Sequence, residues 1–359
     1  MSRPPSNHRL TVISHSDLPP TIPDVKTLDD LLSEPTDELV QSITGVDGDI
    51  IILGVGGKIG PSIARMAKRA SDAAGVDRRV IGVARFSDKK TQAYLTDHGI
   101  ETIRADLFDP QQLGSLPEAP NVIFMVGRKF GTTGSEPFMW AINASLPALV
   151  CERFPDSRIL AFSTLCVYPF VSPETGGSTE ADPAAPVGEY AMSTLARERV
   201  FEHHCNVSTT PTSLIRLTYS VEMRYGVLID IARWVWRGEP IDLSVGYVNV
   251  LWQADANAMI LRSIEHATVP ARIFNVAGSG VLSVKKLAEK FGERMKRQVV
   301  FSGDPGPDAL LINGDAARDV LGQPRVVTDQ LVEWTADWVM NAREYNRKPT
   351  RFEVRDGKF

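Results

Sequence analysis

The sequence predicts an α/β protein in which a doubly wound parallel sheet carries a smaller carboxyl-terminal lobe. Short apolar segments alternate with helical patterns from residue 49 onward, which is typical of βαβ units with helices on both faces of a sheet. The first apolar segment ends in Gly54, Gly57 and Gly60, spaced three residues apart. Near the end of the chain, residues 283–297 and 328–341 have helical periodicity and predict the lobe.

The chain before the first strand is expected to lie over the main domain. Residues 1–48 form this lead segment, which contains several prolines. Within it, residues 27–32 and 36–43 predict short helices, because Thr or Asp stands near each start.

The strands are predicted from apolar runs bounded by polar or turn residues. Before the last strand, residues 227–238 form an apolar helical pattern that departs from the alternation. We therefore expect a main domain over residues 49–222, continued by 246–278, and a lobe made of 223–245 and 279–359. The strand candidates are residues 50–53, 80–84, 101–105, 122–126, 158–162, 212–217 and 272–276.

Composition narrows the class of protein. With 359 residues, 43% of them apolar, the chain can bury a full core. The formal net charge is −5 and basic residues are scattered, which disfavours nucleic acid or an anionic membrane as a partner. No apolar run approaches the roughly 20 residues of a membrane span. Residues 1–10 lack the apolar core of a signal peptide, so we expect a cytoplasmic protein.

The cysteines and histidines do not predict a metal site. Cys151, Cys166 and Cys205 are odd in number and none stands in a Cys-x-x-Cys pair, which argues against a disulfide framework or a zinc site. His203 and His204 are adjacent and cannot both face one site from a helix, so we expect both at the surface.

The glycine-rich loop predicts a phosphate-binding turn between a strand and a helix over residues 61–70. The first glycine permits the turn, the second lets backbone N–H groups approach a pyrophosphate, and the third lets the helix pack on the sheet. A tight turn without a ligand is the alternative. The residues expected at the cofactor are Gly54, Gly57, Lys58, Ile59 and Gly60.

The segments after the second and third strands are expected to hold the adenosine half of the cofactor. Where an NAD-binding fold places an acid for the ribose 2′-hydroxyl, this chain has Ala84 and Arg85, so we favour NADP over NAD. The arginine can instead stack on the adenine. Asp106, with Leu107 beside it, is placed for the adenine amino group, and the alternative is that Asp106 caps the next helix.

Two further motifs carry a family resemblance. The fifth strand runs into Ser163-Thr164-Leu165-Cys166-Val167-Tyr168, and the segment 188–198 contains Tyr190. Together with the glycine loop, Asp106 and Asn143, these motifs recur in the order found in the extended short-chain dehydrogenase/reductase superfamily, the NAD(P)-dependent epimerase/dehydratase family. The resemblance covers about residues 49–278 and implies a Rossmann-type fold that binds NAD(P). It implies that Thr164 hydrogen-bonds the substrate oxygen and that Tyr190 is the acid/base.

One departure from the family pattern concerns the lysine of Tyr-x-x-x-Lys, which is Thr194 here. Tyrosine titrates near pH 10, so Tyr190 needs a nearby cation to act as a base at neutral pH. Arg197 lies on the same helical face, and Lys129 stands where UDP-galactose 4-epimerase, by resemblance, has a lysine near the cofactor. The alternative is that both are solvated surface charges.

The substrate is expected to contact the loop after the fourth strand and the start of the lobe. Residues 130–140 combine hydroxyls, an acid and aromatic rings, a mixture that suits a sugar, although a packed lid is equally consistent. The substrate-binding candidates are Thr132, Thr133, Glu136, Trp140, Arg224 and Tyr225. Arg224 and Tyr225 can grip a phosphate or carboxylate, or tie the lobe to the sheet.

The resemblance implies an NAD(P)-dependent oxidoreductase or epimerase acting on a hydroxyl or keto group of a sugar or sugar derivative. Dehydration is the least expected reaction, because Leu165-Cys166 stands where a family dehydratase has Asp-Glu. The alternative, motivated by Thr194, is an inactive NAD(P)-binding sensor or scaffold. Helices over residues 139–154 and 190–203 can supply a homodimer interface by the same resemblance.

Overall fold

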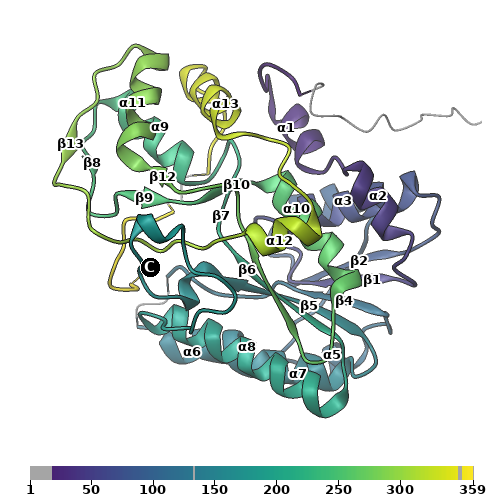
Figure 1. The fold of residues 1–359 in the computed structure, drawn as a ribbon. Helices are drawn as coiled ribbons and strands as arrows, with labels where there is room; N and C mark the ends of the chain where they lie inside the picture. The colour runs from purple at the N-terminus through teal and green to yellow at the C-terminus, as the bar shows by residue number, and fades with distance from the viewer. Residues whose placement is uncertain (1–17, 132–133, 347–349, 359) are drawn as a thin grey trace, which may run out of the picture.

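The structure, a computed structural model, describes residues 18–131, 134–346 and 350–358. Its central sheet is parallel with the strand order β11-β6-β5-β4-β1-β2-β3, which confirms the predicted doubly wound fold (Figure 1). Topology reverses between β1 and β4, and ligands of such sheets bind at the carboxyl edge beside that point. The strands are β1 (Ile50–Leu53), β2 (Val80–Ala84), β3 (Glu101–Arg104), β4 (Asn121–Phe124), β5 (Arg158–Thr164), β6 (Thr212–Leu217) and β11 (Arg272–Val276).

Strand β5 is longer than predicted and ends at Thr164. It continues because Ser163 and Thr164 still pair with Arg216 and Leu217 of β6. The extension brings Thr164 to the carboxyl edge of the sheet, beside the binding crevice.

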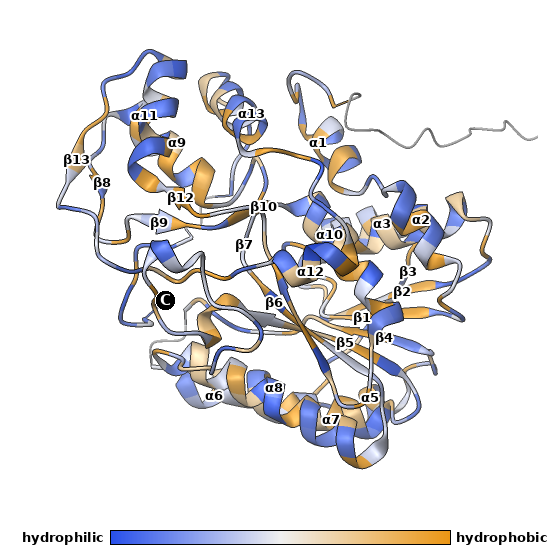
Figure 2. Cartoon of the chain, in the orientation of Figure 1, coloured by the Kyte–Doolittle hydropathy of each residue, from blue (hydrophilic) through white to orange (hydrophobic). Residues whose placement is uncertain are grey.

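The sheet separates two hydrophobic cores. Ile50 and Ile52 of β1 contribute to the core under one helical layer, whereas Ile51 and Leu53 contribute to the core under the other. Successive side chains of a strand point to opposite faces, so a strand covered on both sides needs an unbroken apolar run. The strands are accordingly mostly orange in Figure 2.

Helices cover both faces of the sheet (Figure 1). On one face lie α3 (Gly60–Ala73), α4 (Lys89–Asp97) and α10 (Gln253–Arg262), and on the other lie α5 (Pro110–Gly114), α7 (Leu146–Arg153) and α8 (Glu189–Ser208). The helix predicted over residues 139–154 is not continuous. It consists of α6 (Glu136–Trp140), a π-helical turn η2 (Ala141–Ser145) and α7, and such turns often mark functional sites.

The carboxyl-terminal lobe stands over the carboxyl edge of the sheet. Its helices α9 (Val227–Arg237), α11 (Val284–Met295) and α13 (Thr328–Met340) pack against one another. Three short strand pairs lie outside the central sheet: β7 (Tyr219–Val221) with β10 (Val250–Trp252) in the main domain, β8 (Ile241–Asp242) with β13 (Phe301–Ser302) in the lobe, and β9 (Tyr247–Val248) with β12 (Leu282–Ser283), which connects the two. Helix α12 (Asp315–Leu321) lies beside β11.

The described part of the lead segment lies over the main domain, as predicted. Helices α1 (Val25–Leu32) and α2 (Asp37–Ile43) pack on α3 and α10. The Asp24 carboxylate accepts a 2.7 Å hydrogen bond from the Thr27 amide and so caps α1. Among the described residues, none of the helices combines the length and apolarity that a bilayer crossing requires.

Candidate active site

Three adjoining hollows follow the carboxyl edge of the sheet, with volumes of about 510, 600 and 190 Å³. The first and second share Gly56 and Thr91, and the second and third share Tyr225. Gly56 belongs to the glycine-rich loop, so the row of hollows crosses the sheet where the topology reverses. Such a row suits a long ligand with two ends and a charged middle.

The loop between β1 and α3 has the geometry of an anion-binding turn. Gly54 has φ +91°, and a Cβ on Gly60 would lie 2.0 Å from the Val55 carbonyl oxygen, so both positions require glycine. Helix α3 begins at Gly60 without a side-chain cap. Its first-turn N–H groups and the positive end of the helix dipole therefore favour a phosphate at this place.

Gly57 differs from Gly60 in what surrounds it, which yields a prediction. A Cβ on Gly57 would lie an ordinary 3.5 Å from the Gly54 carbonyl oxygen. We expect Gly57→Ala to leave the free energy of unfolding within about 0.5 kcal/mol but to weaken NAD(P) binding. Gly60→Ala should destabilise the fold by about 2 kcal/mol or more, because the backbone must move. Urea unfolding and calorimetry measure both effects, and equal losses of stability would contradict the distinction.

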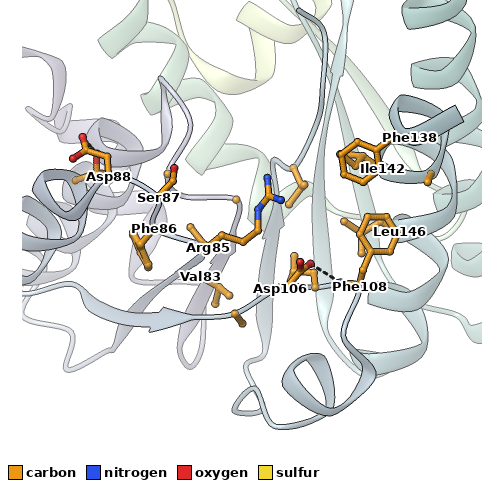
Figure 3. Close-up of a pocket in the computed structure, with 18 residues that line it drawn as sticks. Val83, Arg85, Phe86, Ser87, Asp88, Asp106, Phe108, Phe138, Ile142 and Leu146 are labelled. Atoms are coloured by element: carbon orange, nitrogen blue, oxygen red, sulfur yellow. Dashed lines mark hydrogen bonds between the residues drawn. The ribbon is translucent and has the colours of Figure 1, made fainter. Parts of the chain in front are cut away.

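The first hollow is shaped for an aromatic ring beside a charged group (Figure 3). The exposed Arg85 points into it from the loop after β2. Asp106 and Leu107 line it from the end of β3. The Asp106 carboxylate accepts a 3.1 Å hydrogen bond from the Phe108 amide, whereas Asp109 caps α5. The alternative interpretation of Asp106 as the cap of the next helix is therefore wrong.

The opposite wall of the first hollow is apolar and was not predicted. It is formed by Phe138, Ile142 and Leu146 from α6, η2 and α7. We had expected residues 130–140 at the substrate, yet Phe138 lies at the hollow that Arg85 lines. The aromatic content of the loop was a signal for ring binding, but the sequence does not say which ring.

The third hollow brings together the residues predicted to handle the proton. Thr164, Tyr190 and Lys129 line it, as does Ile59 of the glycine-rich loop. Burial raises the pKa of Tyr190 to about 12, while Arg197 and the hydroxyls of Thr164 and Thr194 lower it. The Lys129 Nζ lies 5.6 Å from the centre of the Tyr190 ring. Burial lowers the pKa of Lys129, and the nearby Glu353 raises it.

The position of the missing lysine is buried and holds a hydroxyl. The Thr194 hydroxyl donates a 2.9 Å hydrogen bond to the Tyr190 carbonyl oxygen, one turn back along α8. Arg197, predicted as the possible replacement, is buried behind the hollow rather than solvated. Its guanidinium donates to the Phe162 carbonyl at 2.8 Å and to the Asn143 side-chain oxygen at 2.7 Å. Lys129 is therefore the cation on the hollow side of Tyr190.

Asn143 joins the elements that meet behind the site. Its Oδ1 also accepts a 3.0 Å hydrogen bond from the Arg128 amide, and its Nδ2 donates to the Arg128 carbonyl and to the Ser193 hydroxyl. These bonds fasten the π-helical turn to the loop after β4 and to the first turns of α8. A buried amide with this many partners fixes the relative position of all three elements.

A buried ion pair lies beside the end of β5, the strand that carries Thr164. Glu198 of α8 and Arg216 of β6 have 0% and 3% exposed side chains and form two hydrogen bonds of 3.0 and 2.7 Å. The Ser163 hydroxyl donates to Glu198, and Arg216 also donates to the Tyr168 hydroxyl at 2.6 Å. The pair raises the pKa of Arg216, so its charge persists at all accessible pH.

The predicted substrate residues separate into two groups. Arg224 and Tyr225 line the second hollow, and Tyr225 also lines the third. Arg224 pairs with Glu222 and with Asp29 of the lead segment, both at 2.9 Å, so it ties segments together. The Lys58 Nζ lies 2.9 Å from the Tyr225 ring centre.

The remaining candidates lie on the loop after β4. Glu136 accepts a 2.9 Å hydrogen bond from the Gly134 amide, and the Trp140 indole N–H donates to Glu189. Neither side chain lines the hollow that contains Tyr190. Thr132 and Thr133 lie outside the described residues.

Several residues around Tyr190 were missed. Tyr219 and Ser220 of β7 and Thr350 near the end of the chain line the third hollow. Tyr219 and Ser220 follow the sixth strand, which is a position that could have pointed to them. Thr350 belongs to an irregular segment without a motif, so the sequence contained no comparable signal.

Strand order and glycine-rich loop together define a Rossmann-type α/β protein. Residues 50–220 match the family model described as NAD dependent epimerase/dehydratase family. This part of the chain, which holds the glycine-rich loop, Thr164 and Tyr190, therefore belongs to that family, in agreement with the predicted resemblance. None of the curated protein sequences matches the chain.

Solved structures of sugar-nucleotide enzymes share the fold. A UDP-glucose 4-epimerase from Thermotoga maritima, solved with UDP-glucose, is 15% identical with a TM-score of 0.67 over 82% of this chain and 99% of its own. A dTDP-glucose 4,6-dehydratase from Bacillus anthracis in complex with NAD is 15% identical, with a TM-score of 0.68 over 82% and 97%. A UDP-glucuronic acid 4-epimerase from Bacillus cereus, in complex with UDP-glucuronic acid and NAD, is 14% identical, with a TM-score of 0.67 over 82% and 99%.

Proposed function

We propose that this protein is an NAD(P)-dependent enzyme that oxidises, reduces or epimerises a hydroxyl or keto carbon of a sugar or sugar derivative. The observation that carries the proposal is the position of Thr164 and Tyr190 in one hollow, at the end of a row that begins beside a glycine-rich loop. Family membership of residues 50–220 and the sugar nucleotides bound by structures of the same fold support it.

The row of hollows fits a dinucleotide. The first would hold the adenosine half, the uncapped start of α3 would hold the pyrophosphate, and Ile59 and Lys129 would border the nicotinamide half. When bound, NAD(P) supplies or accepts the hydride. In the direction of alcohol oxidation, the Thr164 hydroxyl orients the substrate oxygen and the Tyr190 phenolate takes its proton. In reduction, the Tyr190 phenol returns that proton to the oxygen.

Arg85 favours NADP, which gives a prediction on cofactor choice. A charge-assisted hydrogen bond between Arg85 and the 2′-phosphate contributes about 1.5–3 kcal/mol. We therefore expect Arg85→Ala to weaken NADP binding about 10- to 100-fold and NAD binding little, measured by calorimetry with each cofactor. Lys89→Ala is the control, because Lys89 is exposed on α4 and does not line the first hollow. A parallel loss of both cofactors in Arg85→Ala would instead favour stacking on the adenine.

Lys129 is proposed to replace the missing lysine. A cation this close favours the phenolate, so its removal raises the pKa of Tyr190. In Lys129→Met the rising limb of log kcat/KM for alcohol oxidation should shift to higher pH by about 1 unit. At a pH on that limb, kcat/KM should be roughly tenfold lower than in the unaltered enzyme. The reduction direction needs the phenol and should keep its pH dependence over the same range. Lys129→Arg should restore the limb, and an unmoved limb in Lys129→Met would reject the role.

The experiment that tests the function is turnover of a panel of sugars, sugar acids and sugar nucleotides with NADP or NAD, followed near 340 nm and by product analysis. Substrate-specific turnover is the expected result. Binding of cofactor without turnover across the panel would favour the sensor or scaffold hypothesis that Thr194 motivated. Absence of cofactor binding in folded protein would reject both.

The proposal includes a homodimer built on α7 and α8. These helices pack side by side and expose the apolar side chains of Leu149, Met192 and Val207. Exposed apolar side chains on two neighbouring helices suit a helical interface. Light scattering coupled to size exclusion tests this part, and a monomer at micromolar concentration would contradict it.

A further inference from the structure

Two aromatic rings contact the side chain of Lys58, the cation of the glycine-rich loop. Its Nζ lies 2.9 Å from the centre of the Tyr225 ring and 5.5 Å from the centre of the Phe130 ring. Tyr225 stands just before α9 of the lobe, whereas Phe130 belongs to the loop after β4 of the main domain. A cation within about 6 Å of a ring centre is attracted by the negative face of the ring. The two rings therefore favour one position of the Lys58 ammonium, although Lys58 as a whole is exposed.

These contacts put the ammonium at the junction of the second and third hollows. Lys58 lines the second hollow, Phe130 lines the third, and Tyr225 lines both. Under the proposed function, this junction lies between the adenosine and nicotinamide halves of the dinucleotide, where its pyrophosphate would pass. The uncapped start of α3, which favours a phosphate, follows Lys58 directly in the chain. The Lys58 ammonium is therefore placed for the phosphate on the nicotinamide side.

The surroundings of the junction are rich in carboxylates. Arg224 already pairs with two of them at 2.9 Å each, so its charge is balanced within the protein. Burial raises the pKa of Asp230 on α9, and the nearby Lys58 counteracts that rise. A pyrophosphate would be repelled here unless a cation were held beside it. The acidic residues that line the second hollow are Asp29, Glu222 and Glu344.

We propose that Tyr225 is a positioning residue for the cofactor: its ring holds the Lys58 ammonium beside the phosphate on the nicotinamide side, and the Phe130 ring supports the same contact. This inference rests on the proposed function, because it requires that the row of hollows binds NAD(P). It changes the role expected for Tyr225, which acts on the cofactor through Lys58 rather than gripping the substrate. Since Tyr225 belongs to the lobe and Lys58 to the main domain, the phosphate site is complete only with the lobe in this position.

The test compares two fragments of the cofactor, ADP-ribose and AMP, by saturation-transfer NMR titration of the full chain. ADP-ribose carries both phosphates, whereas AMP carries only the one on the adenosine side, and neither has the 2′-phosphate expected at Arg85. We expect Lys58→Met to weaken ADP-ribose binding about 10- to 100-fold. Tyr225→Leu should weaken it about 3- to 10-fold, and Tyr225→Phe, which keeps the ring, should restore it to within about twofold. AMP binding should change less than about twofold in all three variants.

A double variant shows whether the ring acts through the ammonium. Tyr225→Leu added to Lys58→Met should cause no further loss of ADP-ribose affinity, because the ring then has no cation to hold. Tyr345→Leu is the matched control: Tyr345 also lines the second hollow, but its ring contacts Arg233, with the guanidinium carbon 3.5 Å from the ring centre. We expect this control to bind ADP-ribose within about twofold of the unaltered chain.

Three results would overturn the proposal: unchanged ADP-ribose affinity in Tyr225→Leu, equal losses for ADP-ribose and AMP, or losses that multiply in the double variant. Should Tyr225→Leu fail to fold, Phe130→Leu replaces it as the variant that removes the second ring, with an expected loss of about 2- to 5-fold that vanishes in Lys58→Met. Failure of both fragments to bind the unaltered chain would reject the proposed function itself. Normal binding there, with unchanged affinity in Tyr225→Leu, would reject the role of Tyr225 alone.

Discussion

Replacement of Tyr190 by phenylalanine should reduce kcat/KM about 10²- to 10⁴-fold, in both reaction directions, with little change in NADP affinity. General acid or base catalysis by a positioned side chain contributes a factor of this size. The phenyl ring fills the space of the phenol, and the Thr194 and Ser193 hydroxyls bond to the Tyr190 main-chain oxygen, so the start of α8 stays in place. The measurement is steady-state kinetics on the best substrate of the panel, with calorimetry for the cofactor.

The burial of Tyr190 adds a pH dependence to this prediction. Because burial raises its pKa, the oxidation rate of the unaltered enzyme should climb with pH through the neutral range, and Tyr190→Phe should lose that climb. Tyr247→Phe is the matched control, since Tyr247 lies on β9 and does not line the third hollow. Full turnover in Tyr190→Phe would reject the acid/base assignment.

Removal of the buried charge of Glu198 should cost about 3–5 kcal/mol of unfolding free energy. Glu198→Gln leaves Arg216 charged, buried and without its counterion, and breaking one partner of such a pair carries this cost. The Ser163 hydroxyl loses its charged acceptor in the same step. Urea unfolding followed by circular dichroism measures the loss.

The control for the ion pair lies on the same helix. Arg199 and Glu202 form an exposed pair at 2.6 Å, and Glu202→Gln should change stability by about 0.5 kcal/mol or less. Replacing both buried partners with apolar residues, as in Glu198→Leu with Arg216→Met, should recover part of the loss. Similar free energies of unfolding for Glu198→Gln and Glu202→Gln would show that the buried pair contributes no more to stability than the exposed one.

The fold could be predicted from the sequence because parallel strands covered on both faces require apolar runs, and these are visible within a few residues. Ile50 to Leu53 must all be apolar, and Gly54 and Gly60 must lack side chains for reasons that act within a few residues. The ends of the elements were less accessible. Strand β5 continues to Thr164 because its neighbour β6 continues, and that neighbour is distant in the sequence.

Residues of the candidate site could be predicted from the sequence only where they belong to a recognisable motif. Thr164, Tyr190 and Lys129 were predicted in one cleft and do line one hollow. Helical periodicity put Arg197 on the same face as Tyr190, but it could not reveal that Asn143 and the Phe162 carbonyl cover it. Thr350 escaped notice because its contact with Asp230 spans 120 residues and follows no periodicity.

The lead segment shows that the folding unit is larger than the region of recognisable homology. The family match starts at residue 50, yet Leu28, Leu32 and Leu39 of α1 and α2 belong to the same hydrophobic core as β1. Asp29, from the same segment, holds Arg224 at the wall of the second hollow. A boundary drawn from sequence similarity would therefore cut through both the core and the binding groove. A chain trimmed to the matched residues would therefore lack part of its own core and one wall residue of the second hollow.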